Sequence, residues 1–173
     1  GYIGEAFARE LESRGIPFVA VSRKNCNYTN FVELLRFLRE TKPDMLINAA
    51  GFTGRPNVDA CEIAKADTVA GCVLLPQVIA HACEVAGVPW GHVSSGCIYS
   101  GAKIVEHGRT RVEKDMTRPE LRKLVEEKPE CIHGFTEDDR PNFSFRDLPC
   151  SFYSGCKALA EEAIAGAGQH YSW

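Results

Sequence analysis

The sequence lacks the features that mark membrane, zinc-binding and nucleic-acid-binding proteins. No apolar run in its 173 residues approaches the roughly 20 needed to cross a bilayer, and no signal peptide precedes the first helical pattern. Its eight cysteines include no CxxC pair and no Cys/His spacing typical of zinc. A net charge of −3 offers no excess of positive charge for nucleic acid or acidic lipid. We therefore expect a cytoplasmic protein with no metal, no membrane partner and no nucleic-acid partner.

The composition indicates one globular domain. Hydrophobic residues make up 45% of the chain and charged residues 25%, and the length suffices for a substantial core. The cysteines lie mostly within apolar stretches, as Cys61, Cys72, Cys83 and Cys97 do. We interpret them as reduced core thiols rather than a disulfide framework.

Strand and helix patterns alternate along the chain. Short apolar runs at residues 17–22 and 44–51 flank a helical pattern at residues 31–40. A long helical region follows, which Pro76 should kink or divide, and residues 89–95 form a further strand pattern. Such alternation predicts right-handed crossovers in a parallel sheet covered by helices, an α/β fold of three layers.

A glycine turn opens the first helical pattern. Gly1, Tyr2, Ile3 and Gly4 run directly into an amphipathic helix with no strand before it. Such a turn is typical of the end of a GxxGxxG loop, in which bare backbone N–H groups approach a pyrophosphate at the positive end of the helix. The start of an ordinary helix is the alternative interpretation.

The end of the second strand of a dinucleotide-binding fold contacts the adenosine ribose. Ser22 and Arg23 occupy that place here, and a small polar residue beside a base favours the 2′-phosphate of NADP over NAD. Asn27 and Tyr28 follow and would lie beside the adenine, while Thr29 or Asn30 of the same run could instead cap the next helix.

One stretch combines a tyrosine and a lysine four residues apart at the start of a helical pattern. This spacing puts Tyr153 and Lys157 on one helix face. A phenol that works near neutral pH needs its pKa lowered from about 10, and a nearby ammonium would do this. Ser95, at the end of a strand, could bond the carbonyl oxygen that Tyr153 protonates. The alternatives are packing of the Tyr beside a solvated Lys, and loop capping by the Ser.

The order of these motifs resembles a known family. The glycine turn, the NAAG strand end, SSGCIY and YSGCK occur in the order of the extended short-chain dehydrogenase/reductases, the NAD-dependent epimerase/dehydratase superfamily. The run NAAGFTGRPNVDACE, together with GCIY and GFTEDDRPNF, is similar to their nucleotide-sugar branch around dTDP-4-dehydrorhamnose reductase. Within it, the plant epimerase/reductase type of nucleotide-rhamnose synthesis is the most similar. The resemblance implies a Rossmann-type doubly wound parallel sheet.

The resemblance also implies an oxidoreductase of dTDP-rhamnose-type biosynthesis. Reduced NADP would deliver hydride to a keto sugar nucleotide, Tyr153 would donate the proton, and Ser95 would orient the carbonyl. Lys157 would keep the Tyr pKa low and bond the nicotinamide ribose. The further residues that match cofactor-binding positions are Gly1, Tyr2, Ile3, Gly4, Ser22, Arg23, Asn27, Tyr28, Ala49, Ala50 and Gly51. Those that would face the sugar are Thr53, Asn57, Gly96 and Cys97. The family implies a homodimer.

Several departures from the family leave other functions open. Cys72 stands where the family usually has an Asn, and residues 103–132 form a charged insertion whose residues 112–130 resemble a surface helix broken at Pro119. A short insert at residues 144–150 precedes the Tyr motif. The family's first strand and its C-terminal substrate region have no counterpart, so we expect a fragment or a truncated copy.

Two alternatives to the reductase remain open. One is an NAD-retaining epimerase or dehydratase of nucleotide sugars. Such dehydratases commonly carry acids beside the Ser, and Gly96 and Cys97 supply none. The other is a non-catalytic, nucleotide-binding regulatory subunit, against which an intact Ser95, Tyr153 and Lys157 argue.

Overall fold

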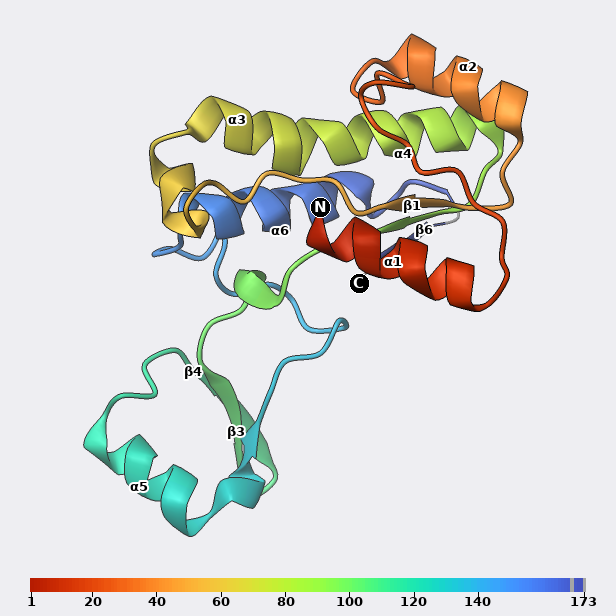
Figure 1. Ribbon diagram of the computed structural model, residues 1–173. Helices are drawn as coiled ribbons and strands as arrows, with labels where there is room; N and C mark the ends of the chain where they lie inside the picture. Colours follow the sequence, from red (N-terminus) through yellow and green to blue (C-terminus); the bar gives the residue numbers. More distant parts are fainter. Residues whose placement is uncertain (169, 173) are drawn as a thin grey trace.

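A three-stranded parallel sheet lies at the centre of the computed structural model, which describes residues 1–168 and 170–172 (Figure 1). Its order is β1-β2-β6, formed by β1 (Leu46–Asn48), β2 (Trp90–His92) and β6 (His170–Ser172). The first two strands fall within the predicted ones and are shorter. The parallel pairing confirms the predicted sheet and brings the carboxyl ends of its strands to one edge.

Helices α2 (Phe31–Thr41), α4 (Leu75–Ala86) and α6 (Phe152–Ile164) form the core with the sheet. Leu34 and Leu38 of α2 are each 1% exposed and pack against α4 and Trp90. Burying such side chains contributes about 1.5–3 kcal/mol each. Helix α2 begins where the sequence predicts, with Asn30 as its N-cap: the side-chain oxygen accepts from Glu33 N at 3.1 Å.

The long helical region is divided, as predicted, near Pro76. Helix α3 (Lys65–Val69) passes through a π-helical segment, η2 (Ala70–Leu74), into α4, and Pro76 lies in the first turn of α4. The π segment absorbs the register change before a residue that has no N–H to donate. By length and composition alone, the 22 residues Lys65–Ala86 would suit a membrane span, contrary to our expectation, but 44% of their most apolar window is buried in the protein.

The predicted strand at residues 17–22 is wrong. These residues form no strand, and their apolar side chains are largely open, with Val19 62% exposed. Helix α1 (Tyr2–Ser13), which precedes them, buries no residue. A strand forms only where a neighbour pairs with its backbone groups, and no strand of the described residues lies beside this segment.

The charged insertion forms a small lobe that projects from the sheet domain (Figure 1). Its antiparallel sheet has the order β4-β3-β5, with β3 (Ala102–Glu106), β4 (Arg109–Glu113) and β5 (Ile132–His133). It is completed by α5 (Pro119–Glu127) and a 3-10 turn, η4 (Pro129–Cys131). The predicted surface helix over residues 112–130 is therefore too long: β4 takes its first residues, and Pro119 begins the helix rather than breaking it.

The cysteines follow the prediction with one clear exception. All eight are free thiols, and five of them are buried: Cys26, Cys61, Cys72, Cys83 and Cys156. Cys97 is exposed, because it lies in the turn after β2 rather than in a core element. Burial raises the pKa of the Cys83 thiol to about 12, so it stays protonated at neutral pH.

Candidate active site

Helix α6 carries the Tyr and Lys of the predicted site at the carboxyl edge of the sheet. Ser151 caps the helix by accepting from Ser154 N at 3.0 Å, which fixes the first turn. Tyr153 and Lys157 follow on one face and are only 9% and 5% exposed. The sequence spacing therefore does bring both side chains into the protein, where water screens them little.

Ser95 lies at the end of β2 and serves two neighbours. Its hydroxyl accepts from Cys97 N at 3.2 Å and so caps a short 3-10 turn, η3 (Gly96–Ile98). It also forms a hydrogen bond with the side chain of Tyr153 that lowers the pKa of that phenol. The capping role and the contact with Tyr153 hold together.

The pKa of Tyr153 differs from the expectation. Burial raises it above its ordinary value of 10.0, and this outweighs the opposing effect of Ser95. Lys157 does not appear among the principal causes of this shift. The expected low pKa of Tyr153 is therefore wrong for this structure, and Tyr153 is a protonated phenol at neutral pH.

The Nζ atom of Lys157 is directed away from the phenol of Tyr153. Its Nζ donates to the Val93 carbonyl oxygen at 3.1 Å and lies 3.4 Å from His92 Nε2. Burial is the largest cause that lowers the pKa of Lys157, while Cys72 and Glu161 act to raise it. Lys157 is thus tied to the end of β2 rather than to the phenol.

Asn48 and His92 belong to the site although our sequence reasoning gave them no role. They are register partners at the ends of β1 and β2, and they are 2% and 1% exposed. Asn48 Nδ2 lies 3.0 Å from His92 Nδ1. The signal that could have found them is a polar residue within each of two apolar strand patterns, since such residues are buried only with partners.

The predicted cofactor positions in the first turn of α1 and at the end of β1 lie at the same edge. The first turn of α1 has no side-chain cap, and a Cβ on Gly4 would lie 3.8 Å from that of Ala49, so this turn meets the end of β1. Ala50 N donates to Asn48 Oδ1 at 3.0 Å. Gly51 is exposed.

The predicted ribose and adenine positions lie in a turn before α2. Ser22 and Arg23 are exposed, and the Ser22 N–H donates to Asn25 Oδ1 at 2.7 Å. Asn27 accepts from the Thr29 hydroxyl at 2.7 Å, and Tyr28 packs against the core that contains α2. The structure shows an ordered turn there.

The predicted sugar-facing residues are exposed loop residues around this edge. Thr53 and Asn57 follow β1, and Asn57 caps a 3-10 turn, η1 (Val58–Glu62), through Asp59 N. Gly96 and Cys97 lie in η3. Cys72, the departure from the family, is buried, and its thiol donates to the Phe52 carbonyl oxygen at 3.0 Å.

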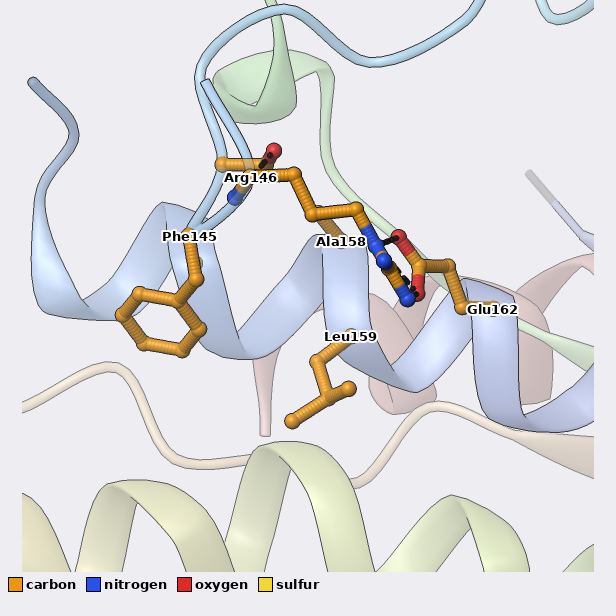
Figure 2. Close-up of a pocket in the computed structure, with 7 residues that line it drawn as sticks. Phe145, Arg146, Ala158, Leu159 and Glu162 are labelled. Carbon is orange, nitrogen blue, oxygen red and sulfur yellow. Dashed lines mark hydrogen bonds and ion pairs between the residues drawn. The ribbon is translucent and has the colours of Figure 1, made fainter. Parts of the chain in front are cut away.

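The insert at residues 144–150 covers the outer face of α6 rather than the carboxyl edge. Figure 2 shows Phe145 and Arg146 beside this helix. They line a hollow whose volume is about 190 Å³. Arg146 forms a bidentate ion pair with Glu162, with Nη2 to Oε2 at 2.8 Å.

Residues 1–122 match the family described as RmlD substrate binding domain. Two Arabidopsis thaliana enzymes are similar over 164 residues, or 95% of the chain. One, 30% identical, is a trifunctional UDP-glucose 4,6-dehydratase/UDP-4-keto-6-deoxy-D-glucose 3,5-epimerase/UDP-4-keto-L-rhamnose-reductase, of which the match covers 20%. The other, 31% identical, is a bifunctional dTDP-4-dehydrorhamnose 3,5-epimerase/dTDP-4-dehydrorhamnose reductase, of which it covers 44%. The chain thus spans less than half the length of these relatives.

Solved structures show the same fold. The UDP-rhamnose synthase L780 of Acanthamoeba polyphaga mimivirus superposes with a TM-score of 0.70 at 22% identity, over 99% of this chain and 51% of that one. The dTDP-4-dehydrorhamnose reductase of Bacillus anthracis, in complex with NADP, superposes with a TM-score of 0.67 at 17% identity, over 98% and 48%. The fold is therefore the Rossmann-type α/β fold that the sequence predicts.

Proposed function

The chain belongs to the RmlD substrate binding domain family, and we propose that it contributes the hydride-transfer site of an NADP-dependent reductase of a keto sugar nucleotide. The main observation that supports this proposal is that α6 and the ends of β1 and β2 bring a protonated, buried Tyr153 together with Ser95 and Lys157. The plant relatives reduce UDP-4-keto-L-rhamnose or dTDP-4-dehydrorhamnose by name, which supports a 4-keto-6-deoxy nucleotide sugar as the substrate.

The residues present fit a dinucleotide. The first turn of α1 has no side-chain cap and lies beside the small residue Ala49 at the end of β1. Such a turn suits a pyrophosphate. A bound reduced nicotinamide would supply the hydride.

The chain's own groups supply the proton and the orientation. Tyr153 holds a proton because burial raises its pKa, so it serves as the general acid toward the keto oxygen. The hydroxyl of Ser95, bonded to Tyr153, is the second donor to that oxygen. The side chain of Lys157, held by the Val93 carbonyl oxygen, would bond the nicotinamide ribose.

We propose NADP rather than NAD because the turn before α2 presents Ser22 and Arg23 to solvent, and residues 17–30 contain no Asp or Glu. Arg23→Glu should weaken NADPH binding at least about tenfold and leave NADH binding within about twofold, since a lost charge-assisted bond to phosphate costs roughly 1.5–3 kcal/mol. Titration of both cofactors by fluorescence measures this, and Arg39→Glu on α2 is the matched control. Equal weakening of both cofactors would reject the preference.

We further propose a cytoplasmic homodimer that pairs through the outer face of α6. Leu159 and Phe145 lie on or beside that face and are 43% and 42% exposed (Figure 2). The eight free cysteines support a reducing compartment. In sedimentation experiments Leu159→Glu should be a monomer. Val125→Glu, at an equally exposed site on α5, is the control and should remain a dimer. If both variants are dimers, the outer face of α6 is not the interface.

The direct test is oxidation of NADPH by the product of the whole reading frame, with UDP- and dTDP-linked 4-keto-6-deoxy sugars as substrates. Turnover with either sugar that prefers NADPH to NADH supports the proposal. Tight cofactor binding with no turnover on any keto sugar would reject it and favour the regulatory-subunit alternative. Release of a 4-keto product from UDP-glucose without added cofactor would favour the NAD-retaining dehydratase.

A further inference from the structure

Three buried polar side chains form a continuous row beneath the carboxyl edge of the sheet. Asn48 Nδ2 lies 3.0 Å from His92 Nδ1, and His92 Nε2 lies 3.4 Å from Lys157 Nζ. None of the three is more than 5% exposed. We refer to these three residues as the buried row. Water does not compete for their bonds, so the direction of each bond matters.

The first bond of the buried row has a fixed direction. Ala50 N–H can only donate, and it donates to Asn48 Oδ1 at 3.0 Å. The amide oxygen of Asn48 is therefore engaged by the backbone, and its NH₂ group faces His92. Reversing the amide would turn NH₂ toward the Ala50 N–H and leave two donors opposed.

This direction selects the tautomer of His92. An NH₂ group donates, so His92 Nδ1 accepts and carries no proton. Burial is the largest cause that lowers the pKa of His92, to about 3, so the ring is neutral at physiological pH. A neutral imidazole has one N–H, which must be on Nε2, the nitrogen that faces Lys157.

The second bond then constrains Lys157. An ammonium has three donors and no acceptor, whereas an uncharged amine has one lone pair. Lys157 Nζ already donates to the Val93 carbonyl oxygen at 3.1 Å. An amine would also accept from His92 Nε2–H and complete the row, whereas an ammonium would set two donors against each other.

We infer that His92, held by Asn48 with its proton on Nε2, is a positioning residue that holds Lys157 as an uncharged amine in the cofactor-free protein. Burial of Lys157 acts in the same direction, while Cys72 of η2 and Glu161 of α6 oppose it. His170 of β6 also acts to lower the pKa of His92 and so helps to keep it neutral. One consequence rests on the proposed reduction. During that reaction Lys157 as an amine can take up a proton, whereas an ammonium can only donate one.

Nuclear magnetic resonance on the cofactor-free chain tests the inference without turnover. Imidazole ¹⁵N shifts give the tautomer of His92, and a pH titration of the lysine ¹³Cε shifts gives the pKa of Lys157. We expect the Nε2–H tautomer, and a rise in the Lys157 pKa of about one unit or more in His92→Gln, whose amide oxygen can accept from an ammonium. His81→Gln, on α4 outside the row, is the matched control and should leave that pKa unchanged.

Asn48→Asp is the sharper variant. The carboxylate keeps an acceptor for Ala50 N–H but faces His92 with a second acceptor, so the ring proton should move to Nδ1. His92 Nε2 would then accept from Lys157, and the Lys157 pKa should rise further.

The wild-type spectrum decides even if a variant fails to fold. A wild-type His92 protonated on Nδ1 would overturn the inference. So would a Lys157 pKa that stays within about 0.3 units of wild type in a folded His92→Gln variant, a shift too small for one hydrogen bond. Because no substrate or cofactor is present, neither result bears on the reductase proposal, and absent turnover would not bear on this one.

Discussion

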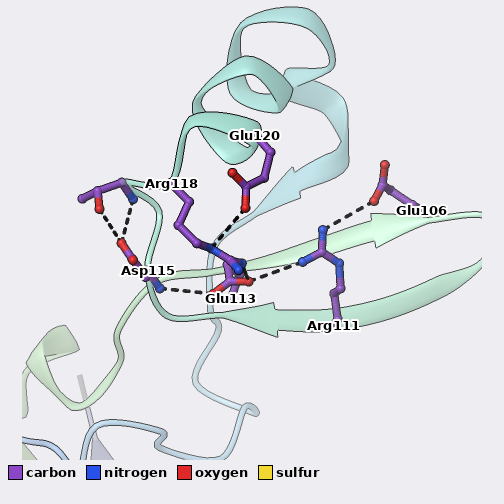
Figure 3. Close-up of polar contacts among 7 residues, drawn as sticks. Glu106, Arg111, Glu113, Asp115, Arg118 and Glu120 are labelled. Carbon is purple, nitrogen blue, oxygen red and sulfur yellow. Dashed lines mark hydrogen bonds and ion pairs between the residues drawn. The ribbon is translucent and has the colours of Figure 1, made fainter.

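The buried row and a group of ion pairs in the lobe are polar networks that differ chiefly in burial. The buried row joins β1, β2 and α6 through side chains that are nearly closed to water. In the lobe, Arg111 bridges Glu106 at 3.6 Å and Glu113 at 3.5 Å, and Arg118 joins Glu113 and Glu120 (Figure 3). Arg111 and Arg118 are 51% and 43% exposed.

The difference shows how burial decides what a polar side chain does. In the lobe, water can replace each lost ion pair, so the network contributes little to stability. In the buried row, every donor needs a protein acceptor, and one backbone N–H at Ala50 determines the protonation pattern as far as Lys157. The following variants should therefore have large effects in the buried row and small ones in the lobe.

Asn48→Leu should have the largest effect on stability. The change leaves the Ala50 N–H and His92 Nδ1 without partners in the core. Each unsatisfied buried group costs about 1–3 kcal/mol, so we expect a loss of roughly 2–5 kcal/mol. Urea denaturation followed by circular dichroism measures it. A loss under 1 kcal/mol would mean that water reaches the buried row.

His92→Gln should change the response to acid. The folded pKa of about 3 lies below the ordinary 6.5, so between these values the unfolded chain binds a proton that the folded chain does not. Stability should fall as the pH falls through this window, by up to about 4–5 kcal/mol in total from this residue. The difference in unfolding free energy between wild type and His92→Gln, measured at each pH, gives the contribution of His92. Parallel stability curves for the two proteins would contradict a neutral buried His92.

Gly155→Ala should have an intermediate effect on stability, and it tests packing on the outer face of α6. A Cβ at Gly155 would overlap the ring of Phe145, which is 42% exposed and can move outward. We expect a loss of about 1–2 kcal/mol, partly offset by the better helix propensity of Ala. The double variant Gly155→Ala/Phe145→Ala should lose less than the sum of the single variants. Strict additivity would show that the two residues do not touch.

Arg118→Ala should have the smallest effect. Its partners Glu113 and Glu120 lie at the lobe surface, and such pairs contribute about 0.2–1 kcal/mol each. We expect a loss under about 1 kcal/mol that shrinks further in 0.5 M salt, measured by thermal unfolding. A loss as large as that of Asn48→Leu would remove the contrast between the two networks.

Much of the sheet domain could be predicted from the sequence because its signals are local. The Tyr153 and Lys157 spacing predicts one helix face, and Asn30, one of the two predicted caps, does cap α2. The Rossmann-type fold followed from alternating patterns and ordered motifs, and the comparisons confirm it.

The errors arise where neighbours decide the structure. Residues 17–22 have strand composition but no strand of the described residues beside them. The hairpin of β3 and β4 was missed although His107 and Gly108, at φ 52 and 72, form a two-residue turn of the kind that joins such strands. The buried row depends on the β1-β2 register, which pairs Asn48 with His92 across 44 residues.

The central claim is that Tyr153 is the proton donor of a reductase site. NADPH oxidation with a 4-keto-6-deoxy nucleotide sugar should fall at least about 100-fold in Tyr153→Phe, because general acid catalysis contributes about 10²–10⁴-fold. The matched control is Tyr99→Phe, which removes the hydroxyl that donates to the Asp139 carbonyl oxygen at 2.8 Å in the neck of the lobe and should keep most turnover. Equal turnover in wild type and Tyr153→Phe, with NADPH still bound, would contradict the account.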